Sequence, residues 1–224
     1  MTSITSDASG SVYAIGYTRG DLDGNTSTSC GACEGFFVVK YDSSGGKQWT
    51  QQLGTSTSNS TIAYGIATDS SGNVYVMGYT GGALDGNTSA GSSDLFVLKY
   101  NSSGSRQWTQ QLVSSANDQA KGIAPDTIGN VYVTVVTYGA LDGNTMAGNT
   151  MDPDFFVVKY DSSGVKQWTK QLETSAVDFG EGIATDSSGN VYMTGSTSLG
   201  LDGNTSAGNQ DLFVVKYDIN GVKQ

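Results

Sequence analysis

The feature that most constrains this chain is an internal repeat, because a repeated unit is one supersecondary structure that must pack on copies of itself. Two motifs recur in four copies. Asp-x-x-Gly-x-Val-Tyr begins at Asp7, Asp69, Asp126 and Asp186, and Leu-Asp-Gly-Asn-Thr begins at Leu22, Leu84, Leu141 and Leu201. Both motifs step by 62, 57 and 60 residues. The copies therefore share one register and differ mainly in loop length.

Two further motifs complete the unit. An aromatic run occurs as FFVVKY or a close variant, starting at Phe36, Leu95, Phe155 and Leu212, and Gln-Trp-Thr follows at Gln48, Gln107 and Gln167. Gln224 aligns with these three glutamines. We interpret the chain as one domain, residues 1–224, with repeats at approximately 1–53, 63–112, 120–172 and 180–224, and we suspect that it is part of a longer precursor.

The second copy shows what each unit folds into. Its β-branched and aromatic residues predict strands at Gly65–Thr68, Val74–Tyr79, Leu95–Tyr100 and Arg106–Leu112. Tight turns at Asp69–Gly72 and Asn101–Gly104 join them in pairs, and a longer loop holds the Leu-Asp-Gly-Asn-Thr motif. Four consecutive antiparallel strands form a β-meander.

A row of such meanders must cover its apolar faces on its neighbours, and radial stacking into a β-propeller does this. We therefore predict an all-β propeller with four four-stranded blades. A β-sandwich built from the same repeats is the alternative. Three forms of propeller stay open: a four-bladed ring with one incomplete blade, an arc of a larger ring, and an arc that a second chain completes.

Composition restricts the partners. The chain has 31 Gly and only 2 Pro, as is typical of short strands joined by tight turns. Its formal charge is −10, whereas binding to a nucleic-acid backbone needs clustered Lys and Arg. Acidic surfaces favour cations. No apolar run approaches the roughly 18 residues of a membrane span, and the first eleven residues do not resemble a signal peptide.

The four registered copies resemble the bacterial β-propeller repeats called SBBP, for seven-bladed β-propeller, and the Asp-Ser-Ser-Gly-Asn-Val-Tyr segment at Asp69 is also similar to strands of NHL-type propellers. The resemblance covers Ile4 to Gln224. It implies one propeller blade per unit and a secreted or cell-surface location in a bacterium. It implies no single activity. The family name calls for seven blades, whereas four units are visible here.

The Leu-Asp-Gly-Asn-Thr loops are candidate calcium sites, because Ca²⁺ takes six to eight oxygen ligands on a loop bent by Gly. The acids that begin the third strands would complete the shell. The candidate ligands are Asp21, Asp23, Asn25, Asp85, Asn87, Asp94, Asp142, Asn144, Asp154, Asp202, Asn204 and Asp211, with Glu34 as the later acid of the first copy.

A purely structural turn explains the same loops, since Asp-Gly-Asn suits a turn with positive φ. Only the first copy contains Asp-x-Asp-Gly-Asn, because Ala83, Ala140 and Gly200 stand where Asp21 does. Both interpretations stay open at this point. A chelator-dependent melting temperature separates them.

Cys30 and Cys33 lie in the long loop of the first copy. A local disulfide is the preferred interpretation, and it suits an oxidising compartment. A redox pair, half of a zinc site shared between chains, and free thiols are the alternatives. A zinc site within one chain is excluded because the sequence has no His and no third Cys.

Recurrence also decides the reading of the aromatic and basic positions. Trp49, Trp108 and Trp168 occupy one register, which favours core packing over carbohydrate stacking. The lysines of the aromatic run recur in all four copies, and we expect them to extend along the sheet and pair with neighbouring acids. These lysines are Lys40, Lys99, Lys159 and Lys216.

Zero His removes the commonest general base and every Ser-His-Asp arrangement. A carboxylate pair that hydrolyses glycosides, or a carbohydrate-binding propeller, is the alternative. The preferred prediction is a non-enzymatic scaffold outside a bacterial cell, with no catalytic residue. We expect its partner to be a protein, which can be a second copy of this chain, or a glycan.

Overall fold

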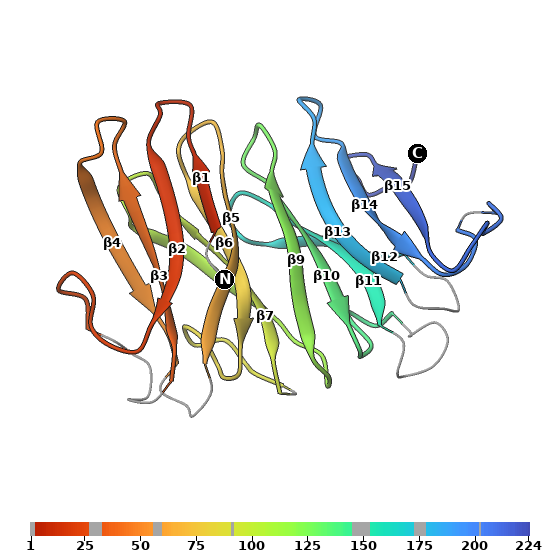
Figure 1. Cartoon of the computed structure of the whole chain (residues 1–224), viewed down its shortest axis with the longest axis horizontal. Coiled ribbons are helices and arrows are strands. Elements are labelled where there is room, and N and C mark those ends of the chain that lie inside the picture. The colour runs from red at the N-terminus through yellow and green to blue at the C-terminus, as the bar shows by residue number, and fades with distance from the viewer. Residues whose placement is uncertain are drawn as a thin grey trace. The chain divides into compact units, whose positions relative to one another are not determined.

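The computed structural model describes residues 3–26, 33–55, 60–90, 92–144, 153–172, 178–201 and 203–224. In these ranges the chain forms fifteen β-strands and their connections, without a helix (Figure 1). It divides into two compact units, Met1–Val113 and Ser114–Gln224. The described residues include no helix long and apolar enough to cross a membrane.

The first unit contains two four-stranded antiparallel sheets, each in chain order. The strands of the first sheet are β1 (Ser3–Ser6), β2 (Val12–Thr18), β3 (Gly35–Tyr41) and β4 (Lys47–Leu53). Those of the second sheet are β5 (Thr61–Thr68), β6 (Val74–Thr80), β7 (Asp94–Tyr100) and β8 (Arg106–Leu112).

The second unit repeats this plan with one strand fewer. Its third sheet consists of β9 (Asp118–Pro125), β10 (Val131–Thr137), β11 (Asp154–Tyr160) and β12 (Lys166–Leu172). The fourth sheet consists of β13 (Asp178–Thr185), β14 (Val191–Thr197) and β15 (Asp211–Tyr217).

The predicted all-β chain with one antiparallel sheet per repeat is confirmed. One detail differs. The first strand of the second sheet starts at Thr61 instead of Gly65, because a bulge between Ala63 and Gly65 breaks the alternation that sequence reasoning depends on. The fourth sheet has three strands among the described residues, and an incomplete blade is one of the forms that the sequence left open. The single-domain interpretation stays a prediction.

The Asp-x-x-Gly-x-Val-Tyr motif builds a hairpin turn that its own aspartate holds. Asp69 Oδ1 accepts hydrogen bonds from the backbone N–H of Ser71 (2.9 Å) and of Asn73 (3.0 Å). Asp69 Oδ2 accepts one from the Tyr75 hydroxyl (3.0 Å). Gly72 takes a φ of 74°, which L side chains rarely adopt. The spacing from Asp to Tyr therefore reflects one closed network between a turn and the strand that follows.

In the first unit the two sheets pack face to face. Strand β5 lies against β1, β2 and β3. The rings of Phe36 and Phe96 stack with centroids 5.1 Å apart, within a cluster of buried apolar side chains from both sheets. Thr68 Oγ1 donates a hydrogen bond to the Ser6 carbonyl of the neighbouring sheet (3.0 Å).

The second unit uses equivalent contacts. Strand β13 lies against β9, β10 and β11. Phe155 and Phe213 contact each other with centroids 6.1 Å apart, and Thr185 Oγ1 donates to the Pro125 carbonyl (2.7 Å). Each unit is thus a pair of stacked sheets, which is the packing that blade repeats require.

Candidate binding site at the outer strand of the fourth sheet

In the sheets that have four strands, the loop with the Leu-Asp-Gly-Asn-Thr motif is hydrogen-bonded to a glutamine side chain of the fourth strand. In the second sheet, the Leu84 N–H donates to Gln111 Oε1 (3.0 Å). Gln111 Nε2 in turn donates to the Gly82 carbonyl (3.2 Å) and to Asp94 Oδ2 (2.8 Å). The loop, the start of β7 and the end of β8 are therefore tied together by one side chain.

The same loop also holds the fourth strand through its asparagine and aspartate. Asn87 Nδ2 donates to the Leu84 carbonyl (2.9 Å) and to the Thr109 carbonyl of β8 (3.3 Å). Asp85, at a φ of 58°, forms an ion pair with Arg106 at 2.5 Å. The turn thus presents both side chains to the neighbouring strand.

The first sheet repeats the arrangement. Asp23 accepts hydrogen bonds from Lys47 Nζ and Thr50 Oγ1, both at 2.6 Å, and the bond from Lys47 contributes most to lowering the pKa of Asp23. Asn25 Nδ2 donates to the Thr50 carbonyl (3.1 Å). Gln52 accepts from the Leu22 N–H (3.1 Å) and donates to a carbonyl of the loop.

The third sheet follows the same plan. Asp142 accepts from Lys166 Nζ and Thr169 Oγ1. Asn144 Nδ2 donates to the Leu141 carbonyl (2.9 Å). Asp154 Oδ2 accepts from Gln171 Nε2 (2.6 Å).

These contacts show how the candidate calcium ligands are used. Asp23, Asp85 and Asp142 contact Lys or Arg, the asparagines bond to backbone carbonyls, and Asp94 and Asp154 bond to glutamine. Glu34 pairs with Arg19 at 3.1 Å, and Asp21 lies exposed in its loop. Asp202 lies outside the described residues. Within the described ranges no three Asp, Glu or Cys side chains gather as a metal site.

Sequence reasoning missed the glutamines, although the signal was present. A glutamine stands in one register at Gln52, Gln111 and Gln171, just before the leucine that ends each fourth strand. Cys33 is 5% exposed and disulfide-bonded. Cys30 lies outside the described residues.

Trp49 and Trp168 each pack against a tyrosine of the other sheet in the same unit. The Trp168 ring lies between Tyr132 of its own sheet and Tyr217 of the fourth, at centroid distances of 5.8 and 6.3 Å. Its Nε1–H donates to the Ile219 carbonyl (3.2 Å), in the turn that follows β15. Gly221 takes a φ of 77°, which L side chains rarely adopt, and a Cβ on it would also lie 3.0 Å from this ring. Trp49 makes the equivalent contacts in the first unit, so the packing role predicted from recurrence is confirmed for Trp49 and Trp168.

The recurrent lysines lie over tyrosine rings of the adjacent strand, a contact that sequence reasoning did not predict. The Nζ-to-centroid distances are 5.1 Å for Lys40 over Tyr13, 5.1 Å for Lys99 over Tyr75, 5.5 Å for Lys159 over Tyr132 and 5.4 Å for Lys216 over Tyr192. Each sheet therefore has a cation–π pair, and in the first three sheets the lysine of this pair lies opposite the tryptophan of the fourth strand.

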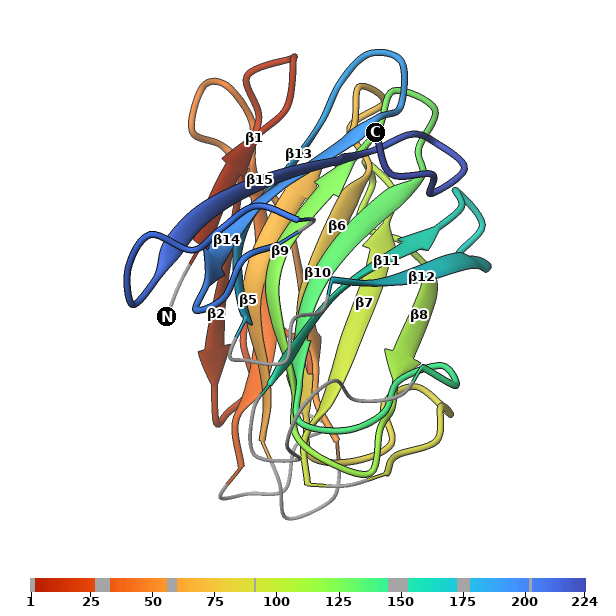
Figure 2. The same cartoon turned by 90° about the vertical axis from the view of Figure 1, so that its right-hand side faces the viewer.

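The fourth sheet lacks a fourth strand among the described residues. Strand β15 pairs with β14 on one side, and Figures 1 and 2 show β14 between β13 and β15. On its other side only Tyr217 forms a bridge, with Lys223, and the Gln224 N–H donates to the Lys216 carbonyl (3.0 Å). On that outer side, Leu212–Val215 have no strand beside them among the described residues, whereas on the other side they pair with β14.

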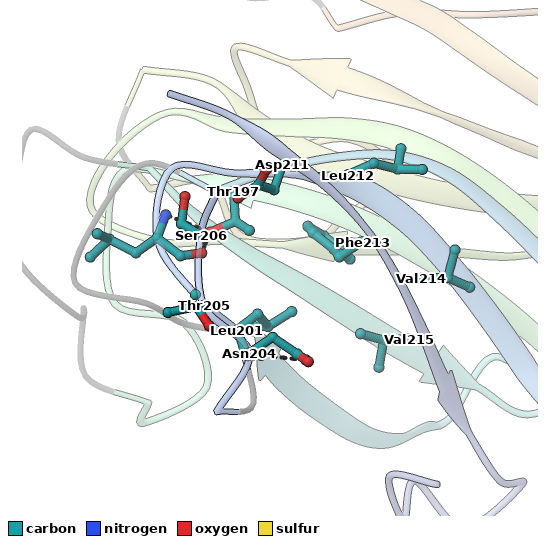
Figure 3. A pocket seen from close by; sticks show the side chains of 12 residues that line it. Thr197, Leu201, Asn204, Thr205, Ser206, Asp211, Leu212, Phe213, Val214 and Val215 are labelled. Atoms are coloured by element: carbon teal, nitrogen blue, oxygen red, sulfur yellow. Dashed lines mark hydrogen bonds between the residues drawn. The ribbon is translucent and has the colours of Figure 1, made fainter. Parts of the chain in front are cut away.

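A pocket of about 280 Å³ lies where the fourth strand of the other sheets would run. Its walls are the 199–206 loop and β15, and Figure 3 shows Leu201, Asn204 and Asp211 around it. Asn204 Nδ2 donates to the Leu201 carbonyl (2.9 Å), as its equivalents do. Asp211 Oδ2 accepts from the Ala207 N–H (2.8 Å), and the hydrogen bond from Ser206 contributes most to lowering the pKa of Asp211. The pocket is therefore preformed and polar at one end.

The outward face of β15 is apolar. Leu212 is 80% exposed and Val214 is 63% exposed, while Phe213 and Val215 on the opposite face are buried in the core of the second unit. The equivalent positions of β11, Phe155 and Val157, are fully buried. The fourth sheet thus ends in an open edge and an uncovered face.

Three segments of the chain match the beta-propeller repeat called SBBP: residues 48–84, 107–141 and 167–200. Each match runs from the Gln-Trp-Thr motif of one copy to the end of β6, β10 or β14 and the start of the loop beyond it. The matched unit therefore spans the boundary between two successive sheets, where the tryptophan lies.

Two curated proteins are similar to the chain over part of its length. An uncharacterised WD repeat-containing protein, L264, of Acanthamoeba polyphaga mimivirus is 26% identical over 183 residues, which are 66% of this chain and 13% of that protein. The regulatory protein FlaEY of Caulobacter vibrioides is 27% identical over 170 residues, which are 69% of this chain and 18% of that protein. The chain thus spans less than a fifth of either relative.

Two solved structures are similar to it at low identity. A Bacteroides caccae protein of unknown function has a TM-score of 0.47 and 11% identity, covering 84% of this chain and 52% of that one. A polysaccharide lyase described as an ulvan lyase has a TM-score of 0.49 and 14% identity, covering 98% of this chain and 56% of that one. Neither likeness carries an argument about function.

Proposed function

Since the chain is built from β-propeller repeats of the SBBP type, we propose that it is a non-enzymatic scaffold that associates with a second copy of itself through the outer faces of its first and fourth sheets. The observation that carries this proposal is the uncovered face of β15. In a fold that stabilises each sheet by stacking it on another, an uncovered apolar sheet face is a surface for association.

Equivalent positions inside each unit support this choice of surface. Phe36 and Val38 of β3 are fully buried against the second sheet, and Phe155 and Val157 of β11 are fully buried in the core that the third and fourth sheets share. Leu212 and Val214 are the corresponding side chains of β15. A sheet that stacked on this face would bury them as it does in the first and third repeats.

The first sheet offers the complementary face. Ile4 of β1 is 69% exposed, whereas Ile66, at the same position in β5, is 8% exposed and belongs to the core of the first unit. Ile183 of β13 packs against the core of the second unit in the same way. Stacking Ile4 of one copy on Leu212 and Val214 of another would reproduce these contacts. Such a head-to-tail contact uses two different surfaces and builds rings or filaments.

The test is the mass of the protein in solution over a wide concentration range, measured by light scattering after size exclusion. We expect the wild-type protein to exceed the mass of one chain as concentration rises. Leu212→Glu and Ile4→Glu should each keep it monomeric, because either places a charge in the contact. Ile128→Glu, at a turn residue that is 67% exposed, is the matched control and should behave as wild type.

A wild-type chain that stays monomeric at every concentration would exclude this association. The non-enzymatic part of the proposal has its own test, a screen against a broad panel of glycosides. No turnover is expected, and hydrolysis of any glycoside would make the chain an enzyme.

Calcium and location extend the proposal. We propose a secreted or surface-exposed bacterial setting, which the export signal of the full-length gene product would test. Calcium would enter the Asp23, Asp85 and Asp142 loops only by displacing Lys or Arg. A melting temperature that rises with Ca²⁺ and falls with chelator would support binding there, and an unchanged one would exclude it.

A further inference from the structure

A second pocket, of about 360 Å³, lies where the loop of the third repeat meets β12. Two loop residues and four consecutive residues of β12 line it: Asp142, Asn144, Lys166, Gln167, Trp168 and Thr169. All six belong to the second unit. The volume is at the low end of the range for small-molecule sites, roughly 300–1,000 Å³. We propose that this pocket binds an uncharged, hydroxyl-rich ligand, one or two sugar residues of a glycan.

One hydrogen bond distinguishes the third repeat from the first two. Asn25 and Asn87 donate from Nδ2 to the carbonyl of the threonine in the fourth strand (3.1 and 3.3 Å), which ties the loop to that strand. Asn144 Nδ2 donates to the Leu141 carbonyl (2.9 Å), but among the described residues it makes no such bond to Thr169. The Asn144 amide therefore keeps a donor for a ligand.

The carbonyl of Thr169 is the matching acceptor. Thr169 lies opposite Val158 of β11, just as Thr50 lies opposite Val39 of β3. Because the Thr50 carbonyl is the one that Asn25 reaches from the outer side, the Thr169 carbonyl points to the outer side as well. A ligand hydroxyl that bridges the amide and this carbonyl would replace the bond found in the first two repeats.

The other lining groups also keep hydrogen-bonding capacity. Asp142 accepts from Lys166 Nζ and Thr169 Oγ1, so its carboxylate has further lone pairs and the ammonium group has further N–H donors. Gln167 Nε2 is used by two contacts within its own turn (2.7 and 3.1 Å), so its Oε1 is the atom that can accept. The pocket therefore offers both donors and acceptors.

The charges of the lining select an uncharged ligand. Asp142 and Lys166 form an ion pair, and their side chains are 23% and 38% exposed, so a ligand can reach both. Asp142 and the formal charge of −10 oppose an anion, and Lys166 opposes a cation. A hydroxyl group donates and accepts at the same time, which suits this lining. Neighbouring hydroxyls on a sugar ring have this property.

Trp168 reports binding but does not define the site. Its ring packs between Tyr132 and Tyr217, and its Nε1–H donates to the Ile219 carbonyl (3.2 Å). The indole is therefore engaged in the core of the second unit, and hydrogen bonds rather than stacking would hold the sugar. Because Trp168 lines the pocket, its indole N–H signal should still respond to a bound ligand.

The experiment titrates the isotopically labelled full chain with the methyl glycosides of glucose, galactose, mannose, xylose and N-acetylglucosamine, each up to about 20 mM, and with glycerol. NMR follows the Trp168 indole and the Asn144 side-chain amide. We expect at least one glycoside to shift both signals saturably with a millimolar Kd, and glycerol to leave them unchanged. No shift with any glycoside, or an equal shift with glycerol, would overturn the proposal.

Paired variants locate the sugar. Thr169→Val and Asn144→Ala each remove one hydrogen-bonding group and should weaken binding by about tenfold. Thr50→Val and Asn25→Ala make the same changes in the first repeat and should leave the affinity unchanged. Backbone amide spectra check that all four variants are folded. Equal effects in the two repeats would place the sugar outside this pocket.

The charge of Asp142 gives a separate test. Asp142→Asn keeps the shape of the side chain and removes the charge that opposes anions, so the affinity for methyl glucuronide relative to methyl glucoside should rise severalfold. An unchanged ratio would contradict the site. Ile4→Glu, which should abolish self-association, should not change sugar binding. The sugar site and the self-association surface can therefore fail independently.

Discussion

The third and fourth sheets differ by one strand, although their aromatic runs are nearly identical. Strand β11 reads Asp-Phe-Phe-Val-Val-Lys-Tyr and β15 reads Asp-Leu-Phe-Val-Val-Lys-Tyr. Strand β11 is buried at every position and pairs along its length with β12, whereas β15 is exposed at Leu212 and Val214 and has a single bridge on its outer side. The comparison teaches that these residues determine the strand and its faces, while the neighbours determine what is covered.

The largest effect should come from a position where the two sheets differ. Gly195 of β14 leaves no room for a side chain, since a Cβ there would lie 2.0 Å from the Phe179 carbonyl oxygen and 2.5 Å from the Phe213 ring. The equivalent residue of β10 is Val135, which is fully buried. Gly195→Ala should lower the free energy of unfolding of the second unit by about 3 kcal/mol.

Urea titration of this variant, followed by tyrosine and tryptophan fluorescence, measures the change. Gly208→Ala is the matched control, because the space around Gly208 is open. Equal stability of the two variants would mean that the strands β13 and β14 lie further apart than in this structure.

The next effect tests the tryptophan of the third sheet, which has no counterpart in the fourth sheet. Trp168→Ala removes the ring between Tyr132 and Tyr217 and the hydrogen bond to the Ile219 carbonyl. We expect a loss of about 2 kcal/mol, less than a fully buried tryptophan would give, because Trp168 is only partly buried. Trp168→Phe keeps a ring and should lose about 1 kcal/mol. Similar losses in the two variants would show that the ring itself contributes little.

A smaller effect compares a loop that holds a strand with one that does not. Asn87→Ala removes hydrogen bonds to the Leu84 and Thr109 carbonyls, whereas Asn204→Ala removes one to the Leu201 carbonyl. Expected losses are about 1.5 kcal/mol for Asn87→Ala and about 0.5 kcal/mol for Asn204→Ala. Thermal denaturation of the two variants in parallel measures the difference, and equal losses would contradict the strand-holding role.

The smallest effect is a dependence on acid. The hydrogen bond from Asn190, with those from Tyr192 and the backbone, lowers the pKa of Asp186 to about 2. Because the pKa is lower in the folded protein than in the unfolded one, this stabilisation is complete above about pH 4 and is lost as the pH falls toward 2. Asp186→Asn should flatten that part of the pH–stability profile, measured by urea unfolding between pH 2 and pH 5. An unchanged slope would contradict it.

The sequence predicted the recurring strands and turns of this molecule. It did not predict features that depend on contacts with another strand, such as the bulge in β5 and the hydrogen bonds to the glutamines. The turn chemistry of Asp69 and Gly72 and the alternation of Val74–Thr80 are local, so strand positions followed from them. The bulge at Ala63 is not local, because it depends on pairing with β6. The Leu-Asp-Gly-Asn-Thr loops fit metal sites or turns equally well from their sequence. Their own residues do not indicate that Gln111 and Arg106 of the fourth strand contact them.

The most direct test of the account is residue-resolved amide hydrogen exchange in the second unit at neutral pH. Because no strand among the described residues lies beside Leu212–Val215 on the outer side of β15, the outward-pointing amides of these residues should exchange at least tenfold faster than their equivalents in β11. Equal protection of β11 and β15 in the free protein would contradict the central claim that the fourth sheet has an open edge.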